Sequence, residues 1–284
     1  MKSLTSVMAL SVFAGFALAS AATAMPIQQR ESSPAVGATP SNKYSGAGAV
    51  RGEAGRAVKR MEQTETMMMR EGGVLFVVRI ENISPDDALK YSDGTTEAAA
   101  MSHGAFAVFR DASPFYIPGQ PAIPGSGIEE IAEDGNVRPA QAFLEANPKV
   151  MESGIFYIPV GASKDSELFK GNAYEFEITG DPGDKLTFAA MLHQSNDLFY
   201  GPKTGGIDLF GADGKPISGD VTAQIGLLDS GTEVDQDPKF GPDGGVNEKS
   251  LNSGPSESDP VGPAGGEFPY PPVEKVLKVT ITPL

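Results

Sequence analysis

Cysteine and tryptophan are absent from this sequence, and histidine occurs only twice, at His103 and His193. Without cysteine the chain has no disulfides, no thiol nucleophile and no attachment point for a bacterial-type lipid anchor. Neither histidine lies in a spacing typical of zinc ligands. Stability must therefore come from an apolar core, with or without help from a metal ion.

Positive charge is also scarce. The chain has 22 Lys and Arg residues against 37 Asp and Glu residues, which gives a formal net charge of −15. Such acidity argues against nucleic acid and anionic membrane surfaces as partners. It suits cations or basic partners, and a merely solvated acidic surface is the alternative.

Long apolar runs are confined to the start of the sequence. Lys2 precedes an almost wholly apolar stretch from Val7 to Ala19, and small residues follow as far as Ala24. This order is typical of a secretory signal peptide spanning residues 1–24. Cleavage after Ala19-Ser20-Ala21 and an uncleaved anchor helix are the alternatives. No later stretch approaches the roughly 20 apolar residues of a membrane span, so we expect a secreted or periplasmic protein without a transmembrane segment in its mature form.

Glycine and proline are abundant, with 34 and 23 residues. These counts predict many turns and irregular loops, as in an all-β fold. Residues 25–72 have few large apolar side chains and predict a disordered linker with one short helix. The sequence therefore predicts a folded domain over residues 73–284.

Short apolar or alternating runs recur along this domain, separated by turn residues. They predict strands at 74–80, 105–109, 154–159, 174–178, 185–192, 207–210, 221–228 and 275–282. Helical patterns cover 127–135 and 139–146. About eight short strands of this kind predict an antiparallel β-sandwich with a short helical insertion and long Pro/Gly-rich loops.

Acidic residues gather where predicted strands end, between residues 191 and 238. Hairpins can bring such loops together at one rim of a sandwich, and Ca²⁺ prefers six to eight oxygen ligands. Asp197, Asp229 and Glu233 are the candidate ligands. Solvated acidic loops without a metal ion are the alternative.

Three stretches of the chain resemble the spondin domain, the N-terminal module of F-spondin and mindin, and above all bacterial proteins with this domain. They are Phe106 to Gly125, Ser195-Asn196-Asp197-Leu198-Phe199 and Asp229-Ser230-Gly231-Thr232-Glu233. The resemblance covers residues 73–240 and implies an antiparallel β-sandwich similar to C2 domains, with a bound calcium ion. It also implies that Asp197, Asp229 and Glu233 correspond to the calcium aspartates of the family.

The chain departs from the spondin pattern at several positions. Asn196 and Leu198 stand where the family has proline and tryptophan, and Glu233 replaces an aspartate. The longer carboxylate can still bind Ca²⁺, often through both oxygens. The cysteines of the animal proteins are missing, and their roles in matrix, integrin and glycosaminoglycan binding are not implied for this chain.

Catalytic motifs are weak in this sequence. Ser195, His193 and Asp197 supply the residue types of a hydrolytic triad, but they are too close in sequence for the relay geometry and no G-x-S-x-G motif is present. The acidic residues of 129–134 could act as glycosidase-type carboxylates, and a solvated helix face is the better interpretation.

The sequence thus favours a secreted, calcium-binding recognition or adhesion-type module without catalytic activity. Its expected partner is an extracellular protein or glycan. A secreted hydrolase on a β-sandwich scaffold and a structural envelope protein are the alternatives. Phe199 and Tyr200 adjoin the expected cation loop and are candidates for an exposed ligand-stacking role.

Overall fold

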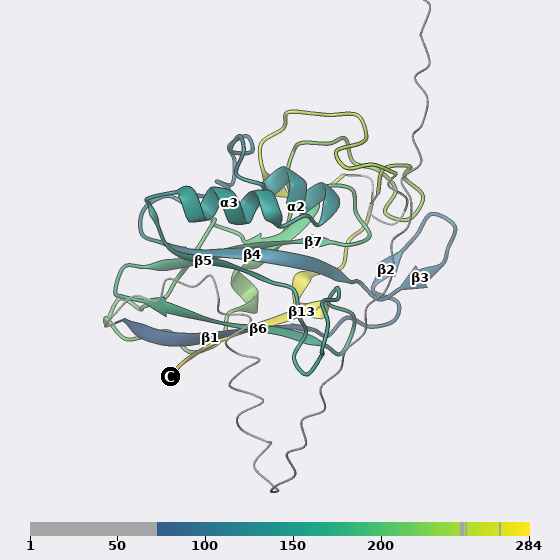
Figure 1. Cartoon of the computed structure of the whole chain (residues 1–284). Helices are drawn as coiled ribbons and strands as arrows, with labels where there is room; N and C mark the ends of the chain where they lie inside the picture. Colours follow the sequence, from purple (N-terminus) through teal and green to yellow (C-terminus); the bar gives the residue numbers. More distant parts are fainter. Residues whose placement is uncertain (1–72, 245–246, 248, 267) are drawn as a thin grey trace, which may run out of the picture. The chain divides into compact units, whose positions relative to one another are not determined.

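The computed structural model describes residues 73–244, 247, 249–266 and 268–284. The predicted signal peptide at 1–24 and the predicted linker at 25–72 lie outside these residues. Two antiparallel β-sheets and a pair of helices form three layers (Figure 1), and the predicted β-sandwich with a helical insertion is confirmed.

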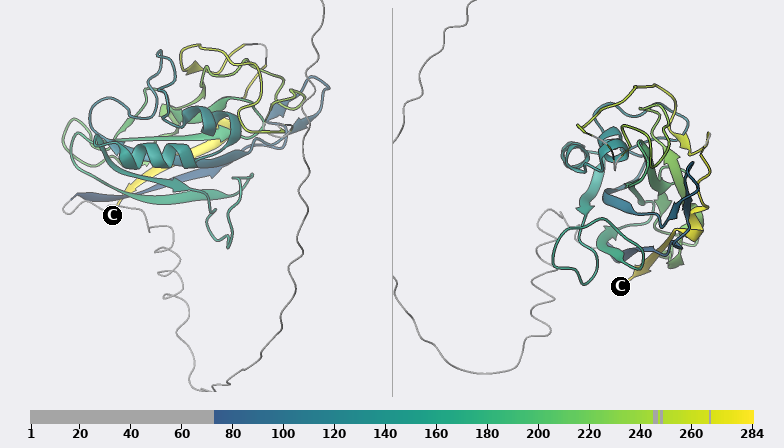
Figure 2. Two further views of the ribbon diagram at one scale, coloured as in Figure 1. Left: turned by 45° about the horizontal axis from the view of Figure 1, so that its top comes forward. Right: turned by 90° about the vertical axis from the view of Figure 1, so that its right-hand side faces the viewer.

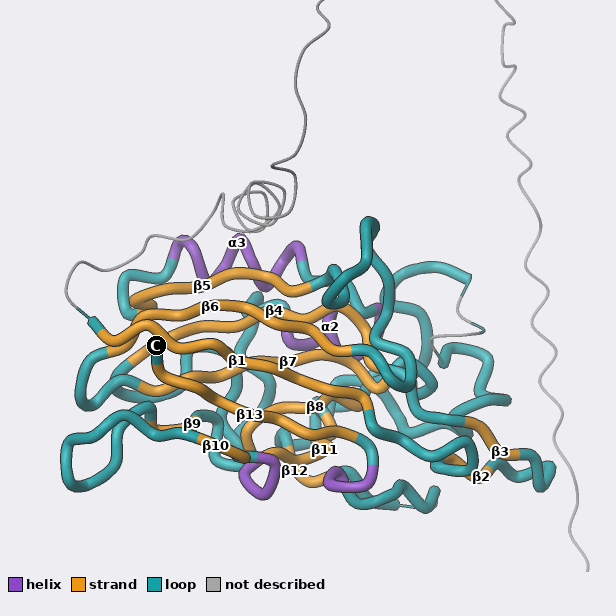
Figure 3. The backbone as a smooth tube through the Cα atoms, turned by 90° about the horizontal axis from the view of Figure 1, so that it is seen from below, coloured by secondary structure: helices purple, strands orange, loops and turns teal. Residues whose placement is uncertain are grey.

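The smaller sheet has the strand order β10-β13-β1-β6 and is seen from its outer side in Figure 3. Its strands are β1 (Val74–Asn82), β6 (Ala173–Gly180), β10 (Gly219–Asp220) and β13 (Leu277–Pro283). Phe76, Val78 and Ile80 of β1 are fully buried, whereas the residues between them are half-buried. Only one face of β1 meets the core, because its outer face carries polar side chains such as Arg79, which pairs with Glu81.

The larger sheet has the order β12-β11-β8-β7-β4-β5, and β9 also pairs with β7. Its strands are β4 (Met101–Phe109), β5 (Val150–Phe156), β7 (Lys185–Leu192), β8 (Leu198–Pro202), β9 (Ile207–Asp208), β11 (Ile225–Asp229) and β12 (Gly262–Pro263). A separate hairpin joins β2 (Leu89–Lys90) to β3 (Thr96–Glu97), and 3₁₀ turns lie at Thr222–Gln224 and Val273–Lys275. Each of the eight predicted strands overlaps an observed one. The five-residue strand β8 and the two-residue strands β2, β3, β10 and β12 were not predicted.

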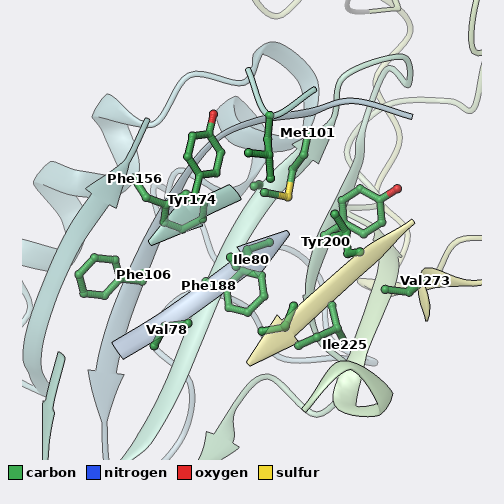
Figure 4. Close-up of a cluster of buried hydrophobic side chains, with 14 of the residues drawn as sticks. Val78, Ile80, Met101, Phe106, Phe156, Tyr174, Phe188, Tyr200, Ile225 and Val273 are labelled. Carbon is green, nitrogen blue, oxygen red and sulfur yellow. The ribbon is translucent and has the colours of Figure 1, made fainter. Parts of the chain in front are cut away.

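The main core fills the space between the two sheets (Figure 4). The Phe176 ring stacks on Phe106 and Phe156, with centroids 4.4 and 5.1 Å away. Gly154 on β5 makes room for this stack, since a Cβ there would meet Phe106 at 2.8 Å. Large aromatic rings packed in this way account for much of the hydrophobic stabilisation of a sandwich.

A second apolar cluster lies on the outer face of the larger sheet, under α2 (Ile128–Asp134) and α3 (Arg138–Ala146). Figure 2 shows both helices lying across this face. Small side chains such as Ala105, Ala107 and Ala189 line the sheet beneath them and let the helices approach. Gly127, with φ 81°, allows the start of α2 to pack closely against α3. A Cβ at this position would lie 2.2 Å from the Ala140 nitrogen. Among the described residues no helix combines the length and apolarity that crossing a bilayer requires.

Candidate metal centre

The turn between β7 and β8 presents the first candidate ligand, Asp197. The Ser195 hydroxyl donates to the Leu192 carbonyl at 2.8 Å and accepts from the Leu198 backbone N–H at 3.1 Å. These bonds close the turn and direct Asp197 into the protein, where it is 0% exposed. Ser195 therefore has a structural role in this turn.

The second candidate ligand, Asp229, lies at the end of β11. In the register of the larger sheet Asp229 lies opposite Leu198, so neighbouring strands carry Asp197 and Asp229 to the same edge. The Gly231 backbone N–H donates to Asp229 Oδ1 at 2.6 Å, and the Ser230 N–H donates to the Asp197 carbonyl at 3.2 Å. These short local bonds fix the distance between the two carboxylates.

A third carboxylate reaches this edge from a distant segment. The Glu257 N–H donates to the Thr232 carbonyl at 2.9 Å, and the Asp259 N–H donates to the Gly231 carbonyl at 3.0 Å. This pairing brings a carboxylate oxygen of Glu257 close to those of Asp197 and Asp229, and the three oxygens lie within 4.8 Å of one another. We call these three residues the acidic centre.

The predicted ligand Glu233 takes another position. The structure does not bring its carboxylate into the acidic centre with the predicted residues Asp197 and Asp229. Glu233 Oε1 accepts a hydrogen bond from Gln236 Nε2 at 2.9 Å, and the same nitrogen donates to Asp243 at 3.1 Å. The Glu233 side chain thus helps to fold the turn that follows it.

Burial and mutual repulsion disfavour ionisation of the carboxyl groups in the acidic centre. Burial and the negative charges of Asp229 and Asp235 raise the pKa of Asp197 to about 9, while the nearby Glu233 N–H acts in the opposite direction. Even so, neither carboxylate oxygen of Asp197 has a hydrogen-bond partner within the described part of the chain. Burial and the charge of Asp229 also raise the pKa of Glu257. A buried carboxylate without a partner is costly unless a proton or a cation neutralises it.

A hydroxyl chain links the acidic centre to helix α2. The Ser230 and Thr232 hydroxyls lie 2.6 Å apart, and Thr232 Oγ1 donates to Glu133 Oε1 at 2.7 Å. Glu133 is buried, and burial raises its pKa to about 7. The interpretation of 129–134 as a solvated helix face is therefore wrong for Glu133, which lies on the buried side of α2.

Ser195, His193 and His103, the residues considered for catalysis, each make local contacts in the described part of the chain. The hydroxyl of Ser195 is engaged in its own turn. The backbone N–H of His193 donates to the Ala100 carbonyl, and the ring of His103 lies edge-on to Tyr157. Burial lowers the pKa of His103. Phe199 and Tyr200, which we considered as exposed stacking residues, are both buried on β8.

A cleft of about 220 Å³ borders the acidic centre. Gly231, Thr232 and residues 257–259 form one wall, and the loop and helix start at 121–130 form the other. Glu257 therefore belongs both to the acidic centre and to the cleft wall.

Comparison of the chain with protein-family models and with curated proteins finds no match.

Proposed function

We propose that this protein is an exported, calcium-binding recognition module without catalytic activity. The observation that carries the proposal is the Asp197 carboxylate, which is fully buried, without a hydrogen-bond partner, and close to two further carboxylates. A divalent cation at this point compensates the buried negative charge that the protein itself leaves unpaired.

The chemistry of the donor set favours Ca²⁺. The acidic centre offers oxygen ligands alone, which hard cations prefer, and backbone carbonyls of the surrounding loops can complete a flexible shell of six to eight oxygens. Mg²⁺ demands stricter octahedral geometry and usually keeps several waters. The resemblance of the 195–199 and 229–233 stretches to the spondin domain supports the same choice.

The proposed export and the proposed class of partner are inferred from the sequence. The signal-peptide pattern at 1–24 favours a secreted or periplasmic location. Extracellular calcium modules bind with dissociation constants of roughly 10⁻⁴ to 10⁻³ M, which matches the calcium available outside cells. We expect the partner to be an extracellular protein or glycan, in an adhesion-type interaction.

Terbium luminescence and calorimetry test the calcium site. The chain contains no tryptophan, so tyrosine must sensitise bound Tb³⁺. Burial and the charges of Asp235 and Asp197 raise the pKa of Tyr270, which indicates that its ring lies near the acidic centre. We expect Tb³⁺ emission that Ca²⁺ displaces and that Tyr270→Phe reduces without changing the calorimetric Ca²⁺ affinity.

The matched pair of variants is Asp197→Asn and Asp87→Asn. Both remove one negative charge, but Asp87 is exposed in the loop after β1. Asp197→Asn should weaken Ca²⁺ binding by about tenfold or more, equivalent to about 1.4 kcal/mol, and Asp87→Asn should leave it unchanged. Wild-type protein that shows no Ca²⁺ binding in calorimetry would rule out the proposal.

A further inference from the structure

We propose that Glu133 on helix α2 is a positioning residue of the cation site, whose geometry it fixes through the hydroxyl of Thr232. This inference rests on the proposed calcium site and names a residue outside the ligand set that controls its affinity. Glu133 is not among the three carboxylates whose oxygens converge in the acidic centre.

One short segment, residues 229–232, joins the three ligands of the acidic centre. It supplies the first of them itself. Its Ser230 N–H donates to the Asp197 carbonyl at 3.2 Å. Its Thr232 carbonyl accepts from the Glu257 N–H at 2.9 Å. A displacement of this segment therefore changes the distances among all three candidate ligands.

Two neighbouring hydroxyls connect the segment to α2. The Ser230 and Thr232 hydroxyls lie 2.6 Å apart, and Thr232 Oγ1 donates to Glu133 Oε1 at 2.7 Å. Each hydroxyl has only one proton to donate. Because the Thr232 proton is directed to Glu133, the Ser230 hydroxyl donates to Thr232. The chain of donors thus ends at Glu133 and requires an acceptor there.

Helix α2 provides this acceptor at a fixed place. Its residues Ile128, Ile131 and Ala132 are at most 1% exposed and belong to the apolar cluster on the outer face of the larger sheet. Figure 2 shows the helix lying across that face. Apolar side chains packed at the density of a protein interior leave little room for movement. The Glu133 carboxyl is therefore held by the helix independently of the loop that it contacts.

The burial of Glu133 makes its link to the loop specific. The side chain is 5% exposed, and a buried carboxyl is costly unless its hydrogen bonds are made. A buried and satisfied network favours one arrangement, because water cannot replace the bonds that a displacement breaks. The link therefore restricts segment 229–232 to the arrangement in which the three carboxylates converge.

Thr232→Val tests the link with the smallest change of shape, because it replaces a hydroxyl by a methyl group. Groups that orient metal ligands without touching the ion affect metal affinity by about 10- to 100-fold. Calorimetry should therefore show that Thr232→Val weakens Ca²⁺ binding by about tenfold or more. Thr232→Ser, which restores the hydroxyl, should recover most of the affinity.

The hydration of bound Tb³⁺ reports the geometry of the site. Luminescence lifetimes in H₂O and D₂O measure how much water remains on the ion. A carboxylate that leaves the coordination shell is replaced by water, so Tb³⁺ bound to Thr232→Val should carry more water than in the wild type. A loss of stability alone does not change this quantity.

Thr222→Val is the matched control. Thr222 is buried, and its hydroxyl accepts from the Val279 N–H at 2.9 Å. It lies before β11, whereas the acidic centre lies at the other end of that strand. Thr222→Val should lower the melting temperature but leave Ca²⁺ affinity and Tb³⁺ hydration unchanged. An equal loss of affinity in Thr222→Val and Thr232→Val would overturn the inference.

Two substitutions of Glu133 test whether it acts through Thr232. Glu133→Leu and Glu133→Gln both remove the charge, but only glutamine keeps an acceptor for Thr232. Glu133→Leu should bind Ca²⁺ more weakly than Glu133→Gln, and the addition of Thr232→Val to it should cause no further loss. Equal affinities of the two single variants, or additive losses in the double variant, would remove the role assigned to Glu133.

Calorimetry on the wild type separates the two proposals. If the wild type binds Ca²⁺ and folded Thr232→Val binds it equally well, the inference is overturned and the calcium site stands. If the wild type does not bind Ca²⁺, the proposed function fails and the inference fails with it.

Discussion

The sandwich and the loops beside the acidic centre, at residues 231–237 and 255–260, belong to one domain but are stabilised in different ways. The sandwich buries aromatic and aliphatic side chains from both sheets, including Phe106, Phe156 and Phe188. The loops beside the acidic centre bury chiefly backbone and polar groups, such as Glu233. Apolar burial does not depend on ions, whereas an acidic centre depends on what neutralises it. Core substitutions should therefore destabilise the sandwich whether or not a cation is bound. Changes of cation, charge or pH should act mainly on the acidic centre.

The largest expected effect comes from the core. Phe188 is fully buried between the sheets, and Phe188→Ala should lower the free energy of unfolding by about 3–5 kcal/mol. Because the loss is one of packing, it should be the same in Ca²⁺ and in chelator. Urea unfolding under both conditions measures it, and a loss that differs strongly between them would contradict the separation of the two regions.

Removal of the Asp197 carboxyl should have a smaller effect on stability, with opposite signs in chelator and in Ca²⁺. Asp197→Asn removes the cost of burying an ionisable carboxyl beside Asp229 and should stabilise the protein in chelator. It should also reduce the stabilisation by Ca²⁺, about 2.7 kcal/mol at a hundredfold excess over the dissociation constant, by about 1.4 kcal/mol or more. Thermal melts in Ca²⁺ and in chelator measure both changes, with Asp87→Asn as the charge-matched control. A calcium-induced shift of undiminished size in Asp197→Asn would contradict the assignment.

The third largest effect is expected from the turn after β11. Gly231 has φ 68°, and a Cβ there would lie 2.1 Å from the Asp259 carbonyl oxygen. Gly214 has a similar φ of 75°, with no atom within 4 Å of its added Cβ. Both alanine variants carry backbone strain of about 1–2 kcal/mol, but only Gly231→Ala also forces residues 231 and 259 apart. Calorimetry should show weaker Ca²⁺ binding for Gly231→Ala alone, and equal affinities in the two variants would count against the pairing of 231 with 259.

The smallest expected effect is a dependence on pH through Glu133. Burial raises its pKa from 4.5 to about 7, and the charges of Glu129 and Asp134 add to the rise, while the Thr232 hydroxyl lowers it. The protonated carboxyl is therefore favoured by the folded state. Its contribution to stability is fully present below pH 4.5 and is lost as the pH rises through 7.

Glu133→Gln keeps an oxygen acceptor for Thr232 and removes the titration. At pH 8 this variant should be more stable than the wild type by about 1–2 kcal/mol, and the difference should vanish near pH 4. Unfolding curves at the two pH values measure the change. Glu274→Gln is the control, and a constant difference between the two pH values would exclude the titration of Glu133 as the cause.

The strands of the sandwich could be predicted because their signal is local. Alternation over 174–178 and 275–282 and apolar runs such as 185–192 predict β6, β13 and β7 without knowledge of the fold. Strand β8 was missed because Gly201 and Pro202 follow only three apolar residues and resemble a loop. Its membership of the sheet is fixed by pairing with β7 and β11.

The acidic centre could be predicted only in part, for a related reason. Asp229 directly follows the predicted strand 221–228, and Asp197 lies in the turn after the predicted strand 185–192, so their approach could be expected. Glu257 lies in a stretch of Ser, Pro, Gly and Asp without periodicity, and it reaches the centre through backbone pairing with Thr232. Glu233 was chosen because it lies in the acidic loop after a predicted strand and ends the spondin-like stretch 229–233, but its side chain is directed to Gln236.

Strands β1 and β13, which lie at opposite ends of the described domain, are paired along seven residue positions, from Phe76 with Pro283 to Asn82 with Leu277. The smaller sheet cannot be completed until β13 has been synthesised, so β1 lacks one of its pairing strands until then. Contacts between such distant parts of a chain form slowly. This order of events is compatible with the proposed export, in which the polypeptide crosses a membrane unfolded and folds on the far side.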